Sequence, residues 1–112
     1  MATLTVQTIS RAGITPTWNN AAAGGDAFAN DGKTQVIVRN NHVSASRTVT
    51  FVTQATVDGQ AVSDRTVTVT AANDFGVVGP FPPEIYNDAN GLLQMTHSDS
   101  AADIQLAILR LP

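Results

Sequence analysis

The chain has 112 residues, a net charge of −3 and a charged-residue content of only 13%. This length predicts a single domain over residues 1–112 that can bury a core of its own. The absence of cysteine excludes disulfides and thiolate metal sites, and the few Lys and Arg residues form no basic cluster of the kind that binds nucleic acid. The start of the chain lacks the regions of a signal peptide, and no stretch approaches the roughly 20 apolar residues of a membrane span.

The first part of the chain predicts one strand over residues 4–9 and then a long irregular segment. Residues 11–32 have no apolar periodicity and contain Gly13, Pro16 and a run of small residues. An irregular segment of about 20 residues is long for a compact domain and often belongs to an interface. We expect Phe28 to anchor the end of this segment in the core.

Short strands with alternating apolar side chains follow at regular spacing. They are predicted over residues 33–40, 47–53, 65–70, 75–78, 92–97 and 104–111, with a hairpin turn at Asp58-Gly59. The alternation predicts a core that includes Val36, Val38, Val49, Phe51, Val67, Val69, Leu106 and Ile108. Residues 101–103 allow one helical turn at most. The predicted fold class is therefore all-β, a single antiparallel β-sandwich of jelly-roll-like form with about seven to eight short strands.

The segment from Val77 to Gly91 predicts a corner between two strands. Gly79-Pro80 ends the first strand, because proline has no N–H group to donate to a ladder. Pro82-Pro83 predicts a stiff, extended crossing, and residues 87–91 predict a turn. None of these residues carries reaction chemistry, so the corner is predicted to have a structural or binding role.

Residues with catalytic or metal-binding potential do not form a site in the sequence. His97, Ser98 and Asp99 are neighbours along a strand, whereas the members of a hydrolase triad converge from separate elements. We interpret His97 as a solvated strand end and His42 as part of a turn. Asp88 lacks the further oxygen ligands of a calcium loop and is interpreted as a turn-capping residue. We therefore predict no enzymatic activity, no cofactor and no metal.

The binding residues are expected in the irregular segment and at the corner. Aromatic and proline side chains supply apolar anchors, and asparagine amides supply both donors and acceptors. A neutral surface of small residues also costs little to desolvate, so we expect both segments to reach out of the sandwich and lie on neighbouring subunits. The interface candidates are Trp18, Asn19, Asn20, Phe28, Pro80, Phe81, Pro82, Pro83, Ile85, Tyr86 and Asn87.

Three stretches resemble the head decoration, or cement, proteins of tailed bacteriophages. They are residues 13–17 continuing to 24–30, residues 56–69, and residues 79–83 with 86–88. The resemblance implies a β-sandwich without catalytic residues that binds the outside of a capsid, clamps adjacent major capsid protein subunits and often forms a homotrimer. It also implies a location on the virion surface after synthesis in the host cytoplasm without a signal peptide.

Two alternatives to a decoration protein remain. One is another phage structural subunit from the tail tube, the tail tip or the head–tail joint. The other is a carbohydrate-binding β-sandwich module. The aromatic content of 5% counts against the carbohydrate-binding module, because sugar-binding faces usually expose several aromatic rings.

Overall fold

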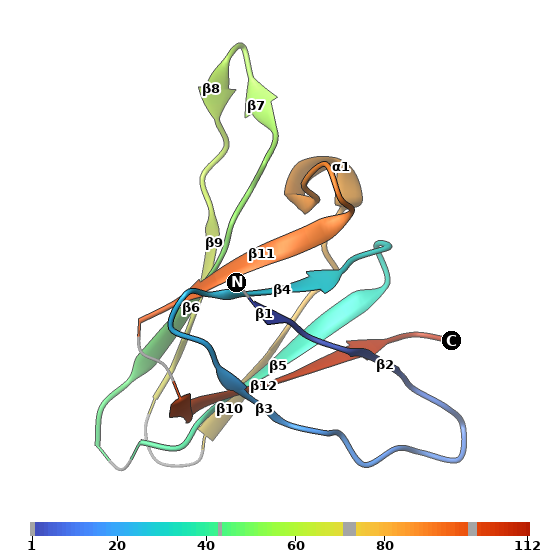
Figure 1. Ribbon diagram of the computed structural model, residues 1–112, viewed down its shortest axis with the longest axis vertical. Coiled ribbons are helices and arrows are strands. Elements are labelled where there is room, and N and C mark those ends of the chain that lie inside the picture. The colour runs from blue at the N-terminus through green and yellow to red at the C-terminus, as the bar shows by residue number, and fades with distance from the viewer. Residues whose placement is uncertain (1, 43, 71–73, 99–100) are drawn as a thin grey trace.

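The computed structural model of the chain describes residues 2–42, 44–70, 74–98 and 101–112. Its regular secondary structure is strand apart from one short helix (Figure 1), which confirms the predicted all-β class. The strands are β1 (Ala2–Thr3), β2 (Val6–Thr8), β3 (Asn19–Ala21), β4 (Asp26–Ala29), β5 (Thr34–Asn40), β6 (Arg47–Phe51), β7 (Thr56–Val57), β8 (Gln60–Ala61), β9 (Arg65–Val69), β10 (Asp74–Val78), β11 (Leu92–His97) and β12 (Ala101–Arg110). The helix α1 (Pro83–Tyr86) lies between β10 and β11.

Two five-stranded sheets are formed. The first, sheet A, has the order β1-β4-β11-β6-β9. The second, sheet B, has the order β10-β5-β12-β2, and β3 also pairs with β12. The expectation of purely antiparallel pairing is wrong at the N-terminal strands, because β1 pairs with β4 and β2 with β12 in parallel. The other ladders of the two sheets are antiparallel.

The core lies between the inward faces of these sheets. Along β5 every second residue is buried, which is the period-2 pattern of a strand with one face in the core. The buried apolar side chains of both sheets form one cluster. Of the predicted core, Val67 is only partly buried, because β9 is an edge strand. The remaining predicted core residues are buried as expected: Val36, Val38, Val49, Phe51, Val69, Leu106 and Ile108.

The prediction that residues 11–32 are irregular is wrong. The segment 11–32 contains β3 and β4, and β4 pairs with both β1 and β11 inside sheet A. The sequence does not show β4 as an alternating strand, because β4 has only 4 residues and places the charged Asp26 at a buried position. Residues 101–103 continue the extended strand β12, where Ala101 is in register with Ala21, and do not form a helical turn.

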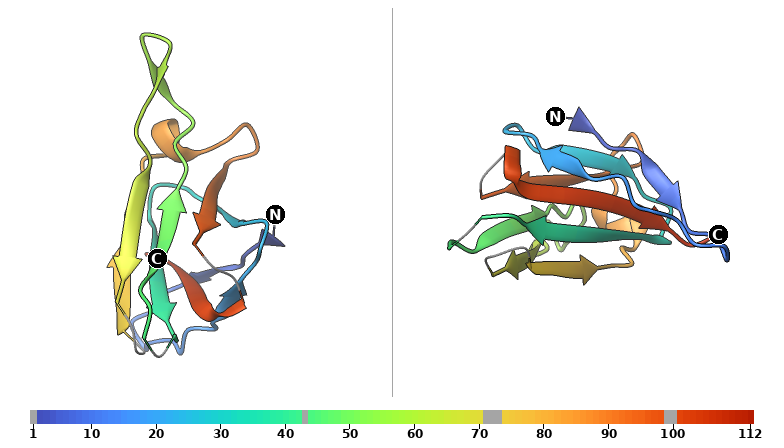
Figure 2. Two further views of the ribbon diagram at one scale, coloured as in Figure 1. Left: turned by 90° about the vertical axis from the view of Figure 1, so that its left-hand side faces the viewer. Right: turned by 90° about the horizontal axis from the view of Figure 1, so that it is seen from below.

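Residues 52–64, which we call the arm, extend away from the body of the molecule (Figures 1 and 2). The arm carries the small hairpin β7–β8, which pairs with neither sheet. Asp58 and Gly59 have φ angles of 52° and 76°, as a two-residue turn between twisted strands requires, so the predicted hairpin turn is confirmed. The base of the arm is fixed to α1, because the N–H groups of Gln54 and Ala55 donate to the carbonyl of Ile85 at 2.8 and 3.1 Å.

Candidate binding surfaces

The corner after β10 begins with a glycine that no other residue can replace without strain. Gly79 has a φ of 135°, and a Cβ atom at this position would lie 2.8 Å from the carbonyl oxygen of Thr34. The following peptide bond, Gly79-Pro80, is cis. The predicted extended crossing holds for Pro82 but not for Pro83, which starts the helix α1. Proline suits the first helical position because its missing N–H group would have no partner there.

A buried amide network holds the corner against the turn after β4. The Asn30 amide donates to the carbonyl of Phe81 at 3.1 Å and to Asn87 Oδ1 at 2.8 Å. The Asn87 amide in turn donates to the Asn30 carbonyl at 2.7 Å, and Asn30 Oδ1 accepts from the Thr34 hydroxyl at 2.6 Å. Asn87, an interface candidate, therefore uses its side chain inside the chain to fix the backbone of the corner.

The turn over residues 87–91 is built around Asp88, as predicted. Its carboxylate accepts from the N–H groups of Asn90 and Leu92 at 2.8 and 3.1 Å and from the amide of Gln94 at 2.8 Å. The hydrogen bond from Gln94, followed by the two from the backbone, lowers the pKa of Asp88 below its ordinary value of 3.8. Within the described residues, no group of three or more His, Asp or Glu side chains is placed to hold a metal ion.

A groove runs along the corner at the foot of the arm. It has a volume of about 430 Å³ and is bordered by Arg65 of β9. The corner supplies the rest of its lining: Val78, Gly79, Pro80, Phe81, Pro82, Ile85 and Tyr86. The structure thus brings Pro80, Phe81, Pro82, Ile85 and Tyr86 together in one concave surface, as expected of neighbours in sequence, and adds Arg65 from a different strand. The sequence contained no signal that Arg65 lies beside the corner.

Two of the aromatic interface candidates are core residues. Phe28 is fully buried and Phe81 is 2% exposed, so neither ring is available to a partner. The Phe81 ring lies 4.8 Å from the ring of Phe51 and 5.2 Å from that of Tyr86, measured between centroids. The expectation that Phe28 anchors its segment in the core is confirmed. Both residues are therefore removed from the candidate interface.

Trp18 lies at a second surface, on the outer face of sheet B. A hollow of about 420 Å³ is lined there by Trp18, Ile37, Arg39 and Phe75. The guanidinium of Arg39 stacks on the Trp18 ring, with its central carbon 4.8 Å from the ring centroid. Asn19 and Asn20, the two other candidates from this segment, belong to β3 and pair with Leu106 and Gln105 of β12. The predicted candidates thus fall on two separate surfaces.

A buried hydrogen bond overturns the interpretation of His97 as a solvated strand end. His97 Nε2 lies 2.6 Å from Asp26 Oδ2, and the two side chains are 1% and 0% exposed. The same carboxylate oxygen accepts from the Ala22 N–H at 3.1 Å. No local pattern in the sequence indicates this pair, because its members are 71 residues apart. Neither residue lines the groove or the hollow, and the pair ties β4 to β11.

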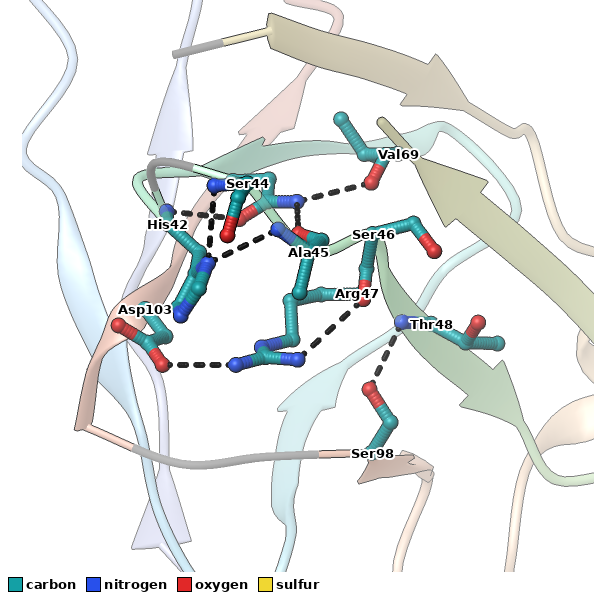
Figure 3. Close-up of polar contacts among 10 residues, drawn as sticks. His42, Ser44, Ala45, Ser46, Arg47, Thr48, Val69, Ser98 and Asp103 are labelled. Carbon is teal, nitrogen blue, oxygen red and sulfur yellow. Dashed lines mark hydrogen bonds and ion pairs between the residues drawn. The ribbon is translucent and has the colours of Figure 1, made fainter. Parts of the chain in front are cut away.

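His42 lies in the connection between β5 and β6, as predicted (Figure 3). Its Nδ1 atom accepts from the N–H groups of Ser44 and Ala45 at 3.1 and 2.9 Å. Beside this turn the side chain of Arg47 forms an ion pair of 3.1 Å with Asp103. The Arg47–Asp103 pair joins β6 of sheet A to β12 of sheet B, and the His42 ring is engaged as a hydrogen-bond acceptor within its own turn.

No protein-family model, curated protein or solved structure matches this chain. In the part of the chain that the structure describes, no helix has the length and apolar character needed to cross a membrane.

Proposed function

We propose that this chain is a non-enzymatic structural protein of a phage virion that binds the outside of the capsid. It acts there as a decoration protein, most simply as a homotrimer, and clamps adjacent subunits of the major capsid protein. The observation that carries this proposal is the groove at the corner, because predicted interface residues line it together. The resemblance of residues 56–69 and 79–83 to cement proteins supports the same assignment.

The groove has the properties of a surface prepared for a protein partner. Its backbone is held by the buried amide of Asn30 and the half-buried amide of Asn87, so little conformational freedom is lost when a partner binds. Proline groups and the Tyr86 ring form its accessible walls, and Arg65 is the charged residue at its border. Aromatic residues and arginine are enriched at the centres of protein interfaces.

The strand order also supports the finer description of the fold as a jelly roll. Apart from the short β1, β2 and β3, each sheet contains strands from both halves of the sequence. In sheet A β11 lies between β4 and β6, and in sheet B β12 lies beside β5. Double sheets of this interleaved kind are common in capsid and lectin domains. The strand order alone assigns no function, because one fold serves many functions.

The proposal is tested by co-sedimentation with capsids purified from the phage that encodes this chain. Deletion of the segment 11–25 is unsuitable, because it removes β3 from sheet B. Instead, Arg65→Glu and Ile85→Ala change the groove, while Arg11→Glu makes the same charge change at an exposed site elsewhere. We expect about tenfold lower occupancy for the groove variants, as for the loss of an interface hot spot, and normal occupancy for the control.

The wild-type protein should also make the shell more resistant to heat, because only the assembled shell presents the site and binding stabilises it by mass action. If the intact protein binds no capsid, the decoration role is wrong. If it binds but the groove variants bind equally well, the protein decorates the shell through a different surface.

A further inference from the structure

The hollow on sheet B opens onto an apolar surface that nothing in the described chain covers. Phe75 and Val77 of β10 are each 60% exposed, and their neighbours across the ladder are Arg39 and Ile37 of β5. Large apolar side chains that are exposed normally stand alone on a protein surface, so several exposed side by side indicate a binding surface.

Arg39 provides the hollow with a fixed positive charge. Its Nε donates to Asn41 Oδ1 at 3.1 Å, and its Nη2 donates to Gln105 Oε1 at 2.7 Å. These partners are neutral amides, and no carboxylate among the described residues pairs with Arg39. A guanidinium has five N–H donors, and these two bonds leave three of them for a further acceptor. The Trp18 ring holds the group flat from one side.

The lining of the hollow indicates the chemistry of its ligand. An arginine with unused donors prefers a carboxylate, which it can bind with two parallel hydrogen bonds. The apolar walls beside Arg39 are Ile37 and Phe75, and they prefer an aliphatic side chain. A sugar would need more hydroxyl partners, but the nearby Gln105 side chain is already engaged with Arg39, Asn41 and Asn20. The expected ligand is therefore an acidic residue next to an apolar one, presented by a protein.

The tip of the arm presents this pair of residues. Val57 is 67% exposed, and the Asp58 side chain forms no hydrogen bond or ion pair within the described part of the chain. Both lie on a hairpin that pairs with neither sheet, and an isolated hairpin gains little stability by itself. The arm extends away from the body (Figure 1), which presents its tip to another molecule.

We propose that the arm tip of one copy docks into the sheet B hollow of a second copy of this chain. Val57 fills the space between Ile37 and Phe75, and the Asp58 carboxylate pairs with Arg39. Each copy then offers one arm and one hollow, so the contact is head-to-tail and builds either a closed ring or an open chain. This contact between copies does not depend on whether the partner of the corner groove is a capsid.

The contact is small compared with a standard protein interface, so self-association is expected to be weak and to depend on concentration. Sedimentation velocity of the wild-type protein at increasing concentration measures it. We expect Asp58→Arg and Arg39→Asp each to abolish association, because each places like charges together at the contact. The matched control is Glu84→Arg, which makes the same charge change at an exposed site on α1 and should associate as the wild type does.

Mixing the two charge-reversal variants gives the decisive result. In the mixture the unchanged arm of the Arg39→Asp variant meets the unchanged hollow of the Asp58→Arg variant, and the reversed arm meets the reversed hollow. Association should therefore return only on mixing. A wild-type protein that stays monomeric at about 1 mM, or a mixture that stays monomeric, would overturn the proposal.

A cross-linking measurement covers the case in which Arg39→Asp does not fold. The chain has no cysteine, so Val57→Cys and Phe75→Cys each introduce a single thiol at an exposed position. Oxidation of the mixed variants should give a disulfide-linked dimer that contains one copy of each. The control mixture pairs Val57→Cys with Leu111→Cys, which is also exposed. Equal cross-linking in both mixtures would show random collision and reject the contact.

Discussion

Replacement of Phe81 by alanine is the most direct test of how the corner is anchored. The Phe81 ring is 2% exposed and lies among three other aromatic rings, those of Phe28, Phe51 and Tyr86. Truncation of a buried phenylalanine to alanine costs about 3–5 kcal/mol, since the side chain loses its burial and leaves a cavity. At about 4 °C per kcal/mol for a domain near this size, the melting temperature should fall by about 12–20 °C.

Urea unfolding followed by circular dichroism measures this loss in the free energy of unfolding. The matched control is Phe75→Ala, which removes the same side chain from a position that is 60% exposed and should change stability by less than about 0.5 kcal/mol. The measurement is made at a low protein concentration, so that contacts between copies do not contribute. A loss below about 1 kcal/mol for Phe81→Ala, or equal losses for both variants, would refute the anchoring of the corner by this ring.

Three further substitutions test other contacts. Gly79→Ala should lower the free energy of unfolding by about 2–4 kcal/mol, measured by thermal unfolding, because residue 79 has a positive φ and the added Cβ would meet the backbone of Thr34. The control Gly13→Ala also has a positive φ but has open space around the Cβ, so it should cost about 1 kcal/mol. Asp88→Asn should destabilise the protein at neutral pH, and the difference from wild type should shrink as pH falls below 3.8, because the lowered pKa gives stability that is lost on protonation. A constant difference across that range would contradict this role. Asn40→Ala should cost about 2–4 kcal/mol, because it leaves the carbonyls of Ala45, before β6, and Val69, at the end of β9, without this donor. An unchanged urea midpoint would show that these bonds contribute nothing.

The strands with one face in the core were predictable because their side chains alternate. β5 and β6 follow the predicted positions closely, and so does the turn at Asp58-Gly59, whose residue types match the geometry that the turn requires. The strand β4 was missed because its inward position is held by Asp26. That carboxylate is compensated in the core by the Ala22 N–H and by His97, and a partner 71 residues away leaves no local pattern.

The candidate surfaces were predictable only in part, for the same reason. Neighbours in sequence such as Pro80, Pro82 and Tyr86 were expected together, and they share a groove. The hollow on sheet B depends on the pairing of β10 with β5, which places Phe75 beside Arg39, and no single segment contains that information. Phe28 and Phe81 were predicted as interface residues but are buried. A sequence alone does not tell whether an aromatic ring faces the core or a partner.

The position of β11 and β12 has a consequence for synthesis of the protein. β11 lies inside sheet A between β4 and β6, and β12 lies inside sheet B beside β5. Both central strands come from residues 92–110, so neither sheet can close until that part of the chain has been made. Until then β5 and β6 expose unpaired edges on the ribosome, and pairings this distant in sequence form slowly. The low charge of the chain gives these edges little protection against pairing with other nascent copies. The yield of folded protein should therefore depend on the local concentration of chains that are being synthesised.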